Sequence, residues 1–337
     1  MKQAILHGPR DLRVEEFELD TEHLDPDQLW VEVEVSALST GTDRGNYEGA
    51  EQIPGAPGYP RWVGYSNVGT VRKVGSAVQR FLPGDRVFST THHASDYIGR
   101  DTDLIAKVPD NVAAEEAAMA MLYFMGFHSL RRGHFEAGEV VAVIGLGILG
   151  LTTVELTRAW GGRVVALGND ETRLRRAEEV GAHLCLDSDD VNLDDRLSEF
   201  TNGVGVDLVV LGANPWPAYR VGVDILRENG RMAVLSLPGR GEEALDFNPL
   251  ALEWFYGKAL TIIAVNGQAP YRYPIADERF SLLRSCEHLL AMMRDGSLQP
   301  GRLITHRLPP ERMTEAYEMA YRRDKSMVGV VFEWRKG

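Results

Sequence analysis

The sequence predicts an α/β protein in which a doubly wound parallel-sheet domain is inserted into a β-rich domain. The first third of the chain carries short strands separated by turn residues, and strands then alternate with helices before the chain returns to a strand at its end. A glycine triplet follows the first strand of the alternating part. We expect residues 1–118 and 266–337 to form the β-rich domain and residues 119–265 to form the parallel-sheet domain.

Composition is typical of a folded protein of about two domains, because 44% of the 337 residues are hydrophobic and 25% are charged. The net charge of −13 argues against a nucleic-acid partner, since phosphate contacts need a basic face. Cys185 and Cys286 are too few for a disulfide framework. The start of the chain shows no apolar leader, and the longest apolar run, Val140–Leu151, is shorter than a membrane helix of about 20 residues. We therefore expect a soluble, cytoplasmic protein without a membrane partner.

In the β-rich part, alternation of apolar and polar residues predicts strands at Leu29–Leu38 and Ser66–Gly75. A Pro-Gly-Asp turn leads into a further strand that ends at Ser89. Helical spacing of apolar residues then predicts a helix over residues 110–133.

The next part of the chain alternates between buried strands and amphipathic helices, which is typical of a parallel sheet. We expect strands at Val140–Ile144, Arg163–Leu167, Val206–Ala213, Gly230–Gly239 and finally Met327–Trp334, and helices from about Ile148, over Glu171–Val180 and over Phe280–Asp295.

The glycine triplet has the spacing G-x-G-x-x-G and comprises Gly145, Gly147 and Gly150, directly after a strand and at the start of a helix. The first glycine permits a tight turn, the second lets the backbone approach a pyrophosphate, and the third allows close helix–strand packing. Ile148 and Leu149 would begin that helix, whose N-terminus attracts phosphate. A plain tight turn explains the triplet alone, but the strand–turn–helix context favours a dinucleotide site.

The end of the following strand decides which dinucleotide is preferred. NAD-binding proteins place a carboxylate there for the ribose 2′-hydroxyl, whereas this chain has Gly168 and Asn169, with Arg173 just beyond. A guanidinium suits a 2′-phosphate, so NADP(H) is favoured over NAD(H). Asp170 is the counterargument, because a shifted loop would bring its carboxylate to the ribose.

With these motifs, the chain resembles the medium-chain dehydrogenase/reductases. The stretch GTVRKVGSAVQRFLPGDRVF, at Gly69–Phe88, is similar to the signature of their GroES-like catalytic domain, and an inserted Rossmann domain follows in the same order. The resemblance implies NAD(P)-dependent oxidoreductase activity on a small-molecule substrate.

The resemblance also shows where this chain departs from the zinc alcohol dehydrogenases. Their ligand motifs C-G-T-D and G-H-E correspond here to Thr40–Asp43 and Gly64–Ser66, and the third ligand position, near Met121–Phe124, holds no Cys, Asp or Glu. We therefore expect no zinc and no other metal. The chain resembles instead the zinc-free, quinone-reductase-like branch, and the stretch SALSTGTD is similar to bacteriochlorophyllide-dehydrogenase-like members.

Without a metal, carbonyl reduction needs a hydrogen-bond donor for the developing oxyanion. Tyr65 replaces a zinc ligand and is the first candidate, although a tyrosine that only fills the vacant volume is an equal alternative. The resemblance places Thr42 where family members have a proton-relay hydroxyl, with a role in a turn or helix cap as the alternative. His93 is a third candidate, since a histidine in a loop that lines the family's cleft could titrate near neutrality.

The resemblance assigns further residues to binding. Substrate contacts are expected from Thr40, His92, Tyr123 and Arg272, with core packing or a solvated loop as the alternative for each of the last three. The segment Leu235–Gly239 passes the nicotinamide in relatives, so Ser236 and Leu237 are expected to contact the cofactor.

These observations predict a metal-independent NADP(H)-dependent oxidoreductase that acts on a small or medium carbonyl or hydroxyl compound. An NADPH-dependent enoyl or quinone reductase is an alternative, and a nucleotide-binding module without catalysis is another. By analogy with relatives, an edge strand near Leu260–Val265 predicts a homodimer.

Overall fold

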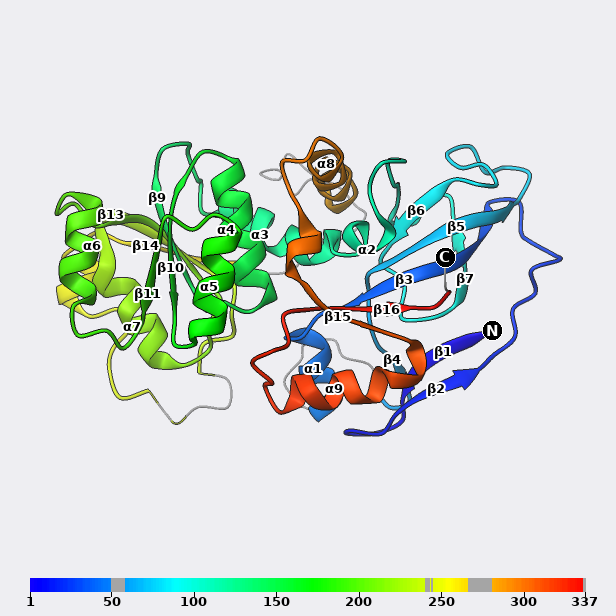
Figure 1. Ribbon diagram of the computed structural model, residues 1–337, viewed down its shortest axis with the longest axis horizontal. Coiled ribbons are helices and arrows are strands. Elements are labelled where there is room, and N and C mark those ends of the chain that lie inside the picture. Colours follow the sequence, from blue (N-terminus) through cyan, green and yellow to red (C-terminus); the bar gives the residue numbers. More distant parts are fainter. Residues whose placement is uncertain (50–57, 240–242, 244, 266–280, 336–337) are drawn as a thin grey trace. The chain divides into compact units, whose positions relative to one another are not determined.

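The computed structural model describes residues 1–49, 58–239, 243, 245–265 and 281–335 (Figure 1). The chain forms two compact units. Unit 1 comprises Met1–Met121 and Gln268–Gly337, and unit 2 comprises Leu122–Gly267. The domain limits expected from the sequence, at residues 118 and 265, fall close to these limits at residues 121 and 267.

Unit 2 contains a parallel sheet in the order β11-β10-β9-β12-β13-β14. From β9 the chain adds strands first on one side, through β10 and β11, and then on the other side, through β12, β13 and β14. Dinucleotide-binding folds show the same change of side. The elements of unit 2 are α3 (Ala120–Arg132), β9 (Val140–Ile144), α4 (Ile148–Ala159), β10 (Arg163–Gly168), α5 (Glu171–Glu179), β11 (Leu184–Asp187), α6 (Leu193–Thr201), β12 (Val206–Leu211), α7 (Trp216–Ile225), β13 (Leu226–Val234), a π-helical turn (Leu252–Tyr256) and β14 (Thr261–Ala264).

The central strands of unit 2 are apolar on both faces because helices cover both. Every residue of β9 is buried, and so are the apolar residues of β12. Figure 1 shows α4 and α5 on one side of the sheet and α6 and α7 on the other. The core therefore fills the space between the sheet and both helical layers, and it fixes the strand ends that carry the glycine loop.

Unit 1 is rich in β-structure. A three-stranded sheet has the order β2-β1-β4, and a larger sheet has the order β15-β16-β3-β5-β6-β8, with β7 paired to β3. Its elements are β1 (Lys2–Leu6), β2 (Leu12–Glu16), β3 (Gln28–Leu38), α1 (Thr42–Glu48), β4 (Arg61–Trp62), β5 (Asn67–Val74), β6 (Arg86–Ser89), β7 (Asp96–Arg100), β8 (Ile105–Lys107), α2 (Ala114–Ala117), α8 (Leu282–Arg294), 3-10 turns (Pro300–Leu303 and Pro310–Arg312), β15 (Ile304–Leu308), α9 (Met313–Tyr321) and β16 (Gly329–Glu333).

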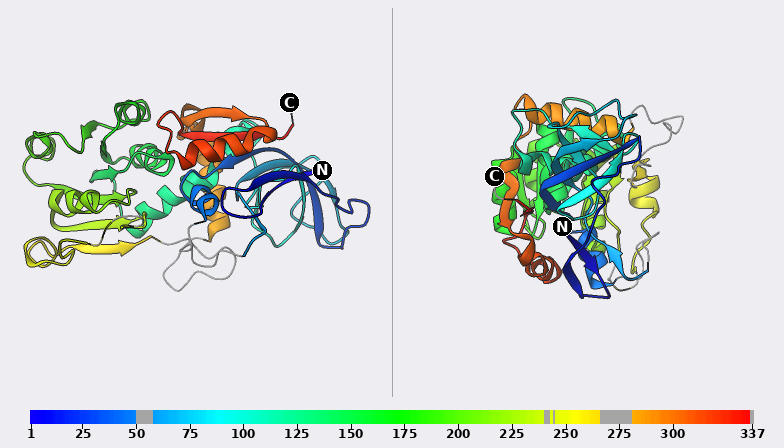
Figure 2. Two further views of the ribbon diagram at one scale, coloured as in Figure 1. Left: turned by 90° about the horizontal axis from the view of Figure 1, so that it is seen from below. Right: turned by 90° about the vertical axis from the view of Figure 1, so that its right-hand side faces the viewer.

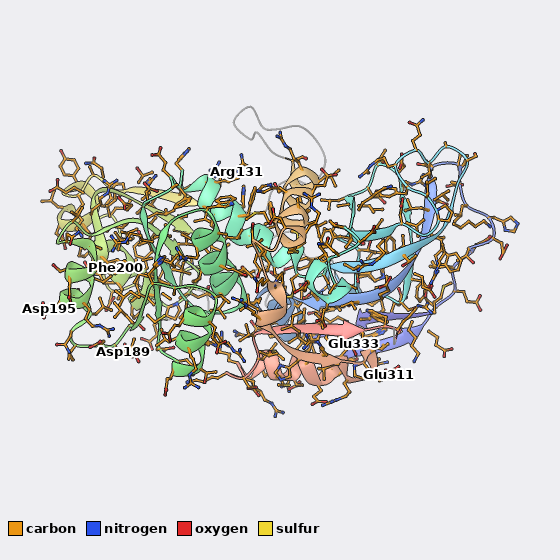
Figure 3. All side chains as sticks on the ribbon, turned by 45° about the horizontal axis from the view of Figure 1, so that its top comes forward. Arg131, Asp189, Asp195, Phe200, Glu311 and Glu333 are labelled. Atoms are coloured by element: carbon orange, nitrogen blue, oxygen red, sulfur yellow. The ribbon has the colours of Figure 1, made fainter. Side chains whose placement is uncertain are left out.

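The C-terminal stretch completes unit 1 by packing on its N-terminal part. Strand β16 pairs antiparallel with β3, and α9 lies against α1, as Figures 1 and 2 show. At this contact the Tyr47 and Tyr317 ring centroids are 5.5 Å apart. Glu311, labelled in Figure 3, forms an ion pair with Lys2 at 2.8 Å. The site residues of unit 1 are thus enclosed by segments from both ends of the sequence.

Two elements differ locally from those expected. The helix expected over residues 110–133 is divided into α2 and α3, and α2 begins only at Ala114, after a turn in which Val112 N–H donates to the Pro109 carbonyl oxygen. The strand expected at Gly230–Gly239 begins four residues earlier, at Leu226, and ends at Val234. No helix among the described residues has the length and apolar character needed to cross a membrane.

Candidate functional site

The glycine loop of unit 2 connects β9 to α4. Gly145 has a φ of +95°, and a Cβ there would lie 2.8 Å from the backbone nitrogen of Ala213, after β12. A Cβ on Gly150 would lie 2.0 Å from the Gly145 carbonyl oxygen, so both positions require glycine. Around Gly147 the space is open, because the nearest atom to a Cβ would be Arg173 Nη1 at 3.6 Å.

The helix that follows this loop begins without a side-chain cap. Gly147 occupies the N-cap position of α4, and no side chain accepts from the N–H groups of the first turn. The uncapped N–H groups and the helix dipole together favour an anion at this position. The loop also lies where the strand order reverses between β9 and β12, which is the place where open α/β sheets bind ligands. These residues therefore fit a dinucleotide pyrophosphate.

The residues that follow β10 bear on whether the ribose site suits NAD(H) or NADP(H). The carboxylate of Asp170 accepts a hydrogen bond from the Arg173 backbone N–H at 3.1 Å and caps α5. The Arg173 side chain turns back to the glycine loop, where Nη1 donates to the Leu146 carbonyl oxygen at 3.2 Å. Burial lowers the pKa of Arg173 and Asp170 opposes that shift, but a guanidinium stays charged. Gly168 and the exposed Asn169 adjoin this position.

The segment after β13 also fits a cofactor. The N–H groups of Leu235 and Ser236 both donate to the Leu211 carbonyl oxygen, and Leu237 N–H donates to Asn214 Oδ1 at 3.1 Å. The Ser236 hydroxyl is buried and has no hydrogen-bond partner among the described residues. A buried hydroxyl of this kind costs free energy until a ligand pairs with it.

In unit 1, the residues that replace the zinc motifs gather around one carboxylate. Asp43 on α1 is fully buried, and its two oxygens accept backbone N–H hydrogen bonds from Ser39 at 2.9 Å and from Gly64 at 3.1 Å. Burial raises the pKa of Asp43 to about 6, although the two N–H groups favour the ionised form. Asp43 therefore joins the end of β3 to the residue that directly precedes Tyr65.

Tyr65 is partly exposed and lies close to this carboxylate. Burial and the charge of Asp43 raise the pKa of Tyr65 to about 12, while the nearby hydroxyls of Ser39 and Thr42 oppose the shift. Thr42 is exposed at the first position of α1. Tyr65 is therefore a neutral phenol that can donate a hydrogen bond or a proton to a substrate oxygen.

Tyr317 on α9 joins the same cluster, although no motif in the sequence predicted it. Its side chain is fully buried, and burial together with the Asp43 carboxylate raises its pKa well above the ordinary value. The sequence signal was weak, because a tyrosine on an amphipathic helix near the C-terminus is typical of core packing.

The two histidines lie in different surroundings from those expected. His93 is completely buried, packs edge-to-face on Phe332, and neither ring nitrogen has a hydrogen-bond partner among the described residues. Burial, and secondarily His92, lowers the pKa of His93 to about 3, so titration near neutrality is not found. The ring of His92 stacks on Trp62 at 5.1 Å, and burial lowers its pKa to about 4. Both imidazoles are therefore neutral at pH 7.

The remaining predicted substrate residues are placed as follows. Thr40 is half-buried beside the start of α1. Tyr123 is fully buried in unit 2, where its hydroxyl donates to Glu155 Oε2 on α4 and joins α3 to that helix. This contact matches the core-packing alternative for Tyr123. Arg272 lies outside the described residues.

Two family models match successive parts of this chain. One describes an alcohol dehydrogenase GroES-like domain and matches residues 25–136, and the other describes a zinc-binding dehydrogenase and matches residues 149–280. Their order agrees with a β-rich unit interrupted by a parallel-sheet unit. The chain belongs to the medium-chain dehydrogenase/reductase superfamily.

Individual members of this superfamily align along most of the chain. A sorbitol dehydrogenase from Halalkalibacterium halodurans is 25% identical, covering 86% of this chain and 87% of that protein. A D-arabitol-phosphate dehydrogenase from Enterococcus avium is 24% identical, covering 87% and 86%. The crystal structure of 2R,3R-butanediol dehydrogenase from Bacillus subtilis is 22% identical, superposes with a TM-score of 0.81 and covers 99% of both chains. That structural likeness concerns the fold alone.

One of the two matching families is described as a zinc-binding dehydrogenase, so the side chains of this chain that could bind zinc are considered next. A catalytic zinc takes three protein ligands from thiolates, imidazoles or carboxylates. No group of three His, Cys, Asp or Glu side chains that could hold a metal ion occurs among the described residues. Both oxygens of Asp43 already accept backbone N–H groups, and Thr40 and Tyr65 offer neutral hydroxyls. The described residues of this member therefore do not fit a zinc centre.

Proposed function

We propose that this medium-chain dehydrogenase/reductase is a metal-independent, NADP(H)-dependent oxidoreductase. It transfers a hydride between the nicotinamide and a small or medium carbonyl or hydroxyl compound. The observation that carries the proposal is the uncapped N-terminus of α4 at the point where the sheet reverses, beside a glycine loop that cannot accommodate a Cβ at Gly145 or Gly150. This geometry supports binding of a dinucleotide pyrophosphate.

The preference for the 2′-phosphate rests on two neighbouring side chains. Asp170 uses one carboxylate oxygen to cap α5, whereas the Arg173 guanidinium lies beside the glycine loop. A charge-assisted hydrogen bond from a guanidinium to phosphate contributes about 1.5–3 kcal/mol. The preference for NADP(H) follows from that contribution.

The relatives support an alcohol-type substrate over an enone. Sorbitol, D-arabitol phosphate and 2R,3R-butanediol are the compounds in the names of the proteins compared above, and each carries neighbouring hydroxyl groups. We therefore place the substrate among polyols and the corresponding hydroxyketones. In reduction the nicotinamide supplies the hydride, and Tyr65 donates a hydrogen bond and then a proton to the carbonyl oxygen. Thr42 and Thr40 contribute further hydroxyls to the substrate.

We further propose a cytoplasmic homodimer formed along the edge of the sheet in unit 2. Strand β14 ends the described sheet, with Ile262 and Ile263 only half-buried. Beside it lies a mainly apolar cavity of about 700 Å³, lined by residues that include Trp216 and Leu250. An open strand edge next to apolar surface is suited to pairing with a second copy.

The first experiment titrates the purified protein with NADPH and NADH by fluorescence and measures its zinc content. It then assays hydroxyketones, polyols, enones and quinones. NADPH preference, absence of zinc and turnover of hydroxyketones or polyols would support the proposal. Turnover of enones or quinones alone would replace it with an enoyl or quinone reductase. Cofactor binding without turnover would indicate a module without catalysis, and stoichiometric zinc would overturn metal independence.

A further inference from the structure

Unit 1 contains a cavity of about 440 Å³ that is lined by segments from both of its parts, among them β1, β2, β3 and the stretch beyond β16. None of its lining residues belongs to the cluster around Asp43 and Tyr65 or to the glycine loop. Cavities of about 300–1,000 Å³ are typical of sites for small molecules. The chemistry of the lining side chains therefore indicates which class of molecule this cavity suits.

Two half-buried indole rings line this cavity, and both use their N–H groups inside unit 1. Trp30 Nε1 donates to Asp96 Oδ1 at 3.2 Å. Trp334 Nε1 donates to Ser36 Oγ at 2.9 Å. Because both N–H groups are already paired, the surface that the two rings offer to a ligand is ring carbon. The faces of an indole ring carry negative electrostatic potential and attract cations.

The charged side chains that line the cavity leave one carboxylate unpaired. Lys2 forms an ion pair at 2.8 Å with Glu311, which Figure 3 labels. Arg335 forms an ion pair at 3.2 Å with the buried Asp96. Glu16 also lines the cavity, but it is exposed and none of the described residues forms an ion pair with it. Its negative charge is therefore the one that a ligand could balance.

The charges just outside the cavity do not alter this balance. Arg335 also forms an ion pair with Glu32 at 2.7 Å, and Glu32 in turn pairs with Arg72. Because the pair of Glu32 and Arg72 is balanced in itself, the excess negative charge of the side chains at the cavity remains that of Glu16.

We propose that this cavity binds a small organic monocation, whose ammonium group contacts the Trp30 and Trp334 rings and whose charge is balanced by Glu16. An anion would meet the unpaired carboxylate and the negative ring faces, so the lining disfavours it. A metal ion also fits poorly, because no group of three His, Cys, Asp or Glu side chains that could hold one occurs in the described part of the chain. The inference does not depend on the proposed function, since it uses none of the residues placed in the dinucleotide site or around Tyr65.

The direct test is a fluorine-19 NMR titration of protein labelled with 5-fluorotryptophan. The chain contains six tryptophans, and the signals of Trp30 and Trp334 are identified by their absence in Trp30→Phe and Trp334→Phe. The probe is choline, and its matched control is 3,3-dimethylbutan-1-ol, which has the same shape without the charge. The titration is made at about pH 9, where an α-amino group at Met1 is mostly neutral. We expect choline to shift both signals and to bind at least about fivefold more tightly than the alcohol. No shift of either signal at about 20 mM choline, or equal affinity for the two compounds, would overturn the proposal.

Two further variants separate the contributions of charge and ring. Glu16→Gln should weaken choline binding by about threefold or more, whereas Glu18→Gln, which removes an exposed carboxylate that does not line the cavity, should leave it unchanged. Equal effects of these two substitutions would contradict the proposal. Trp334→Leu should abolish the preference for choline over the alcohol, and a preference that persists in the folded variant would also contradict it. If Trp334→Leu does not fold, the comparison of choline with the alcohol on the unmodified chain still decides.

Discussion

Arg173 donates a hydrogen bond from Nη1 to the carbonyl oxygen of Leu146 at 3.2 Å and so connects α5 to the glycine loop. If this guanidinium binds a 2′-phosphate, Arg173→Ala should raise the dissociation constant for NADPH by about tenfold or more, equivalent to about 1.4 kcal/mol. Binding of NADH should change little. The control is Arg175→Ala, whose exposed side chain pairs with Glu171 on the same helix. Equal losses for both cofactors would show that Arg173 only supports the loop.

The first two glycines of the loop should respond differently to alanine. At Gly145 a Cβ meets Ala213 at 2.8 Å and the φ is positive, so Gly145→Ala should lower the free energy of unfolding by about 2 kcal/mol. At Gly147 no atom lies nearer than 3.6 Å to the added Cβ, so Gly147→Ala should retain stability and lose cofactor affinity. Urea unfolding and NADPH titration check both. Full cofactor affinity in Gly147→Ala would place the pyrophosphate elsewhere.

Tyr65→Phe removes the proposed proton donor with almost no change in shape. Reduction of a hydroxyketone should slow by about 100-fold, the lower range for general acid catalysis, while NADPH binding persists. The control is Tyr321→Phe, since that side chain is exposed on α9. A rate within twofold of the unmodified chain would support the alternative that Tyr65 fills volume. An enone substrate should be affected less, because water can protonate the enolate.

Buried His93 makes the protein sensitive to acid. Its pKa is about 3 in the folded chain and about 6.5 when unfolded, so the unfolded state binds the proton more tightly. The stabilising contribution is complete above pH 6.5 and falls by about 1.4 kcal/mol per pH unit as the pH drops toward 3. Asp43 acts oppositely, because its pKa is raised to about 6. His93→Gln should therefore show a shallower decline in urea stability from pH 6.5 to 4.5. An identical decline would show that His93 is not the titrating group.

The apolar surface near β14 allows the proposed dimer to be tested. Leu250 lines the cavity and is 56% exposed, so Leu250→Asp should place a charge in the interface and give a monomer by light scattering. Leu82→Asp alters a leucine of unit 1 that is 67% exposed and should leave the dimer intact. A dimer that survives Leu250→Asp would place the interface on another surface.

Features that depend on residues close together in the sequence could be predicted, whereas features that depend on contacts between distant residues could not. The glycine spacing predicted the loop, because Gly145 and Gly150 satisfy local steric requirements that are visible in the sequence. Arg173 followed from the same segment. The surroundings of Asp43 could not be predicted, since Ser39, Gly64 and Tyr317 converge on it from distant positions.

The burial of the two histidines also could not be predicted from the residues next to them in the sequence. A histidine pair after a strand gives no indication of burial, and it is burial that lowers the pKa of His93, whose ring packs against Phe332 and Gly64. Short strands such as β1, β2 and β4 also went unpredicted. Their pairing joins Ile5 to Trp62, far apart in the sequence, so local alternation carries little information about it.

Because unit 1 is assembled from two segments that lie far apart in the sequence, it cannot be finished until the second of them has been synthesised. Strand β3 can pair with β16 only after almost 300 further residues have been synthesised. Every strand of unit 2, in contrast, lies within one continuous stretch of the sequence. Unit 2 is thus able to fold on the ribosome before the domain that precedes it. The apolar edge of β3 stays open during that interval, so a nascent chain stalled before β16 exposes aggregation-prone surface that chaperones would have to shield.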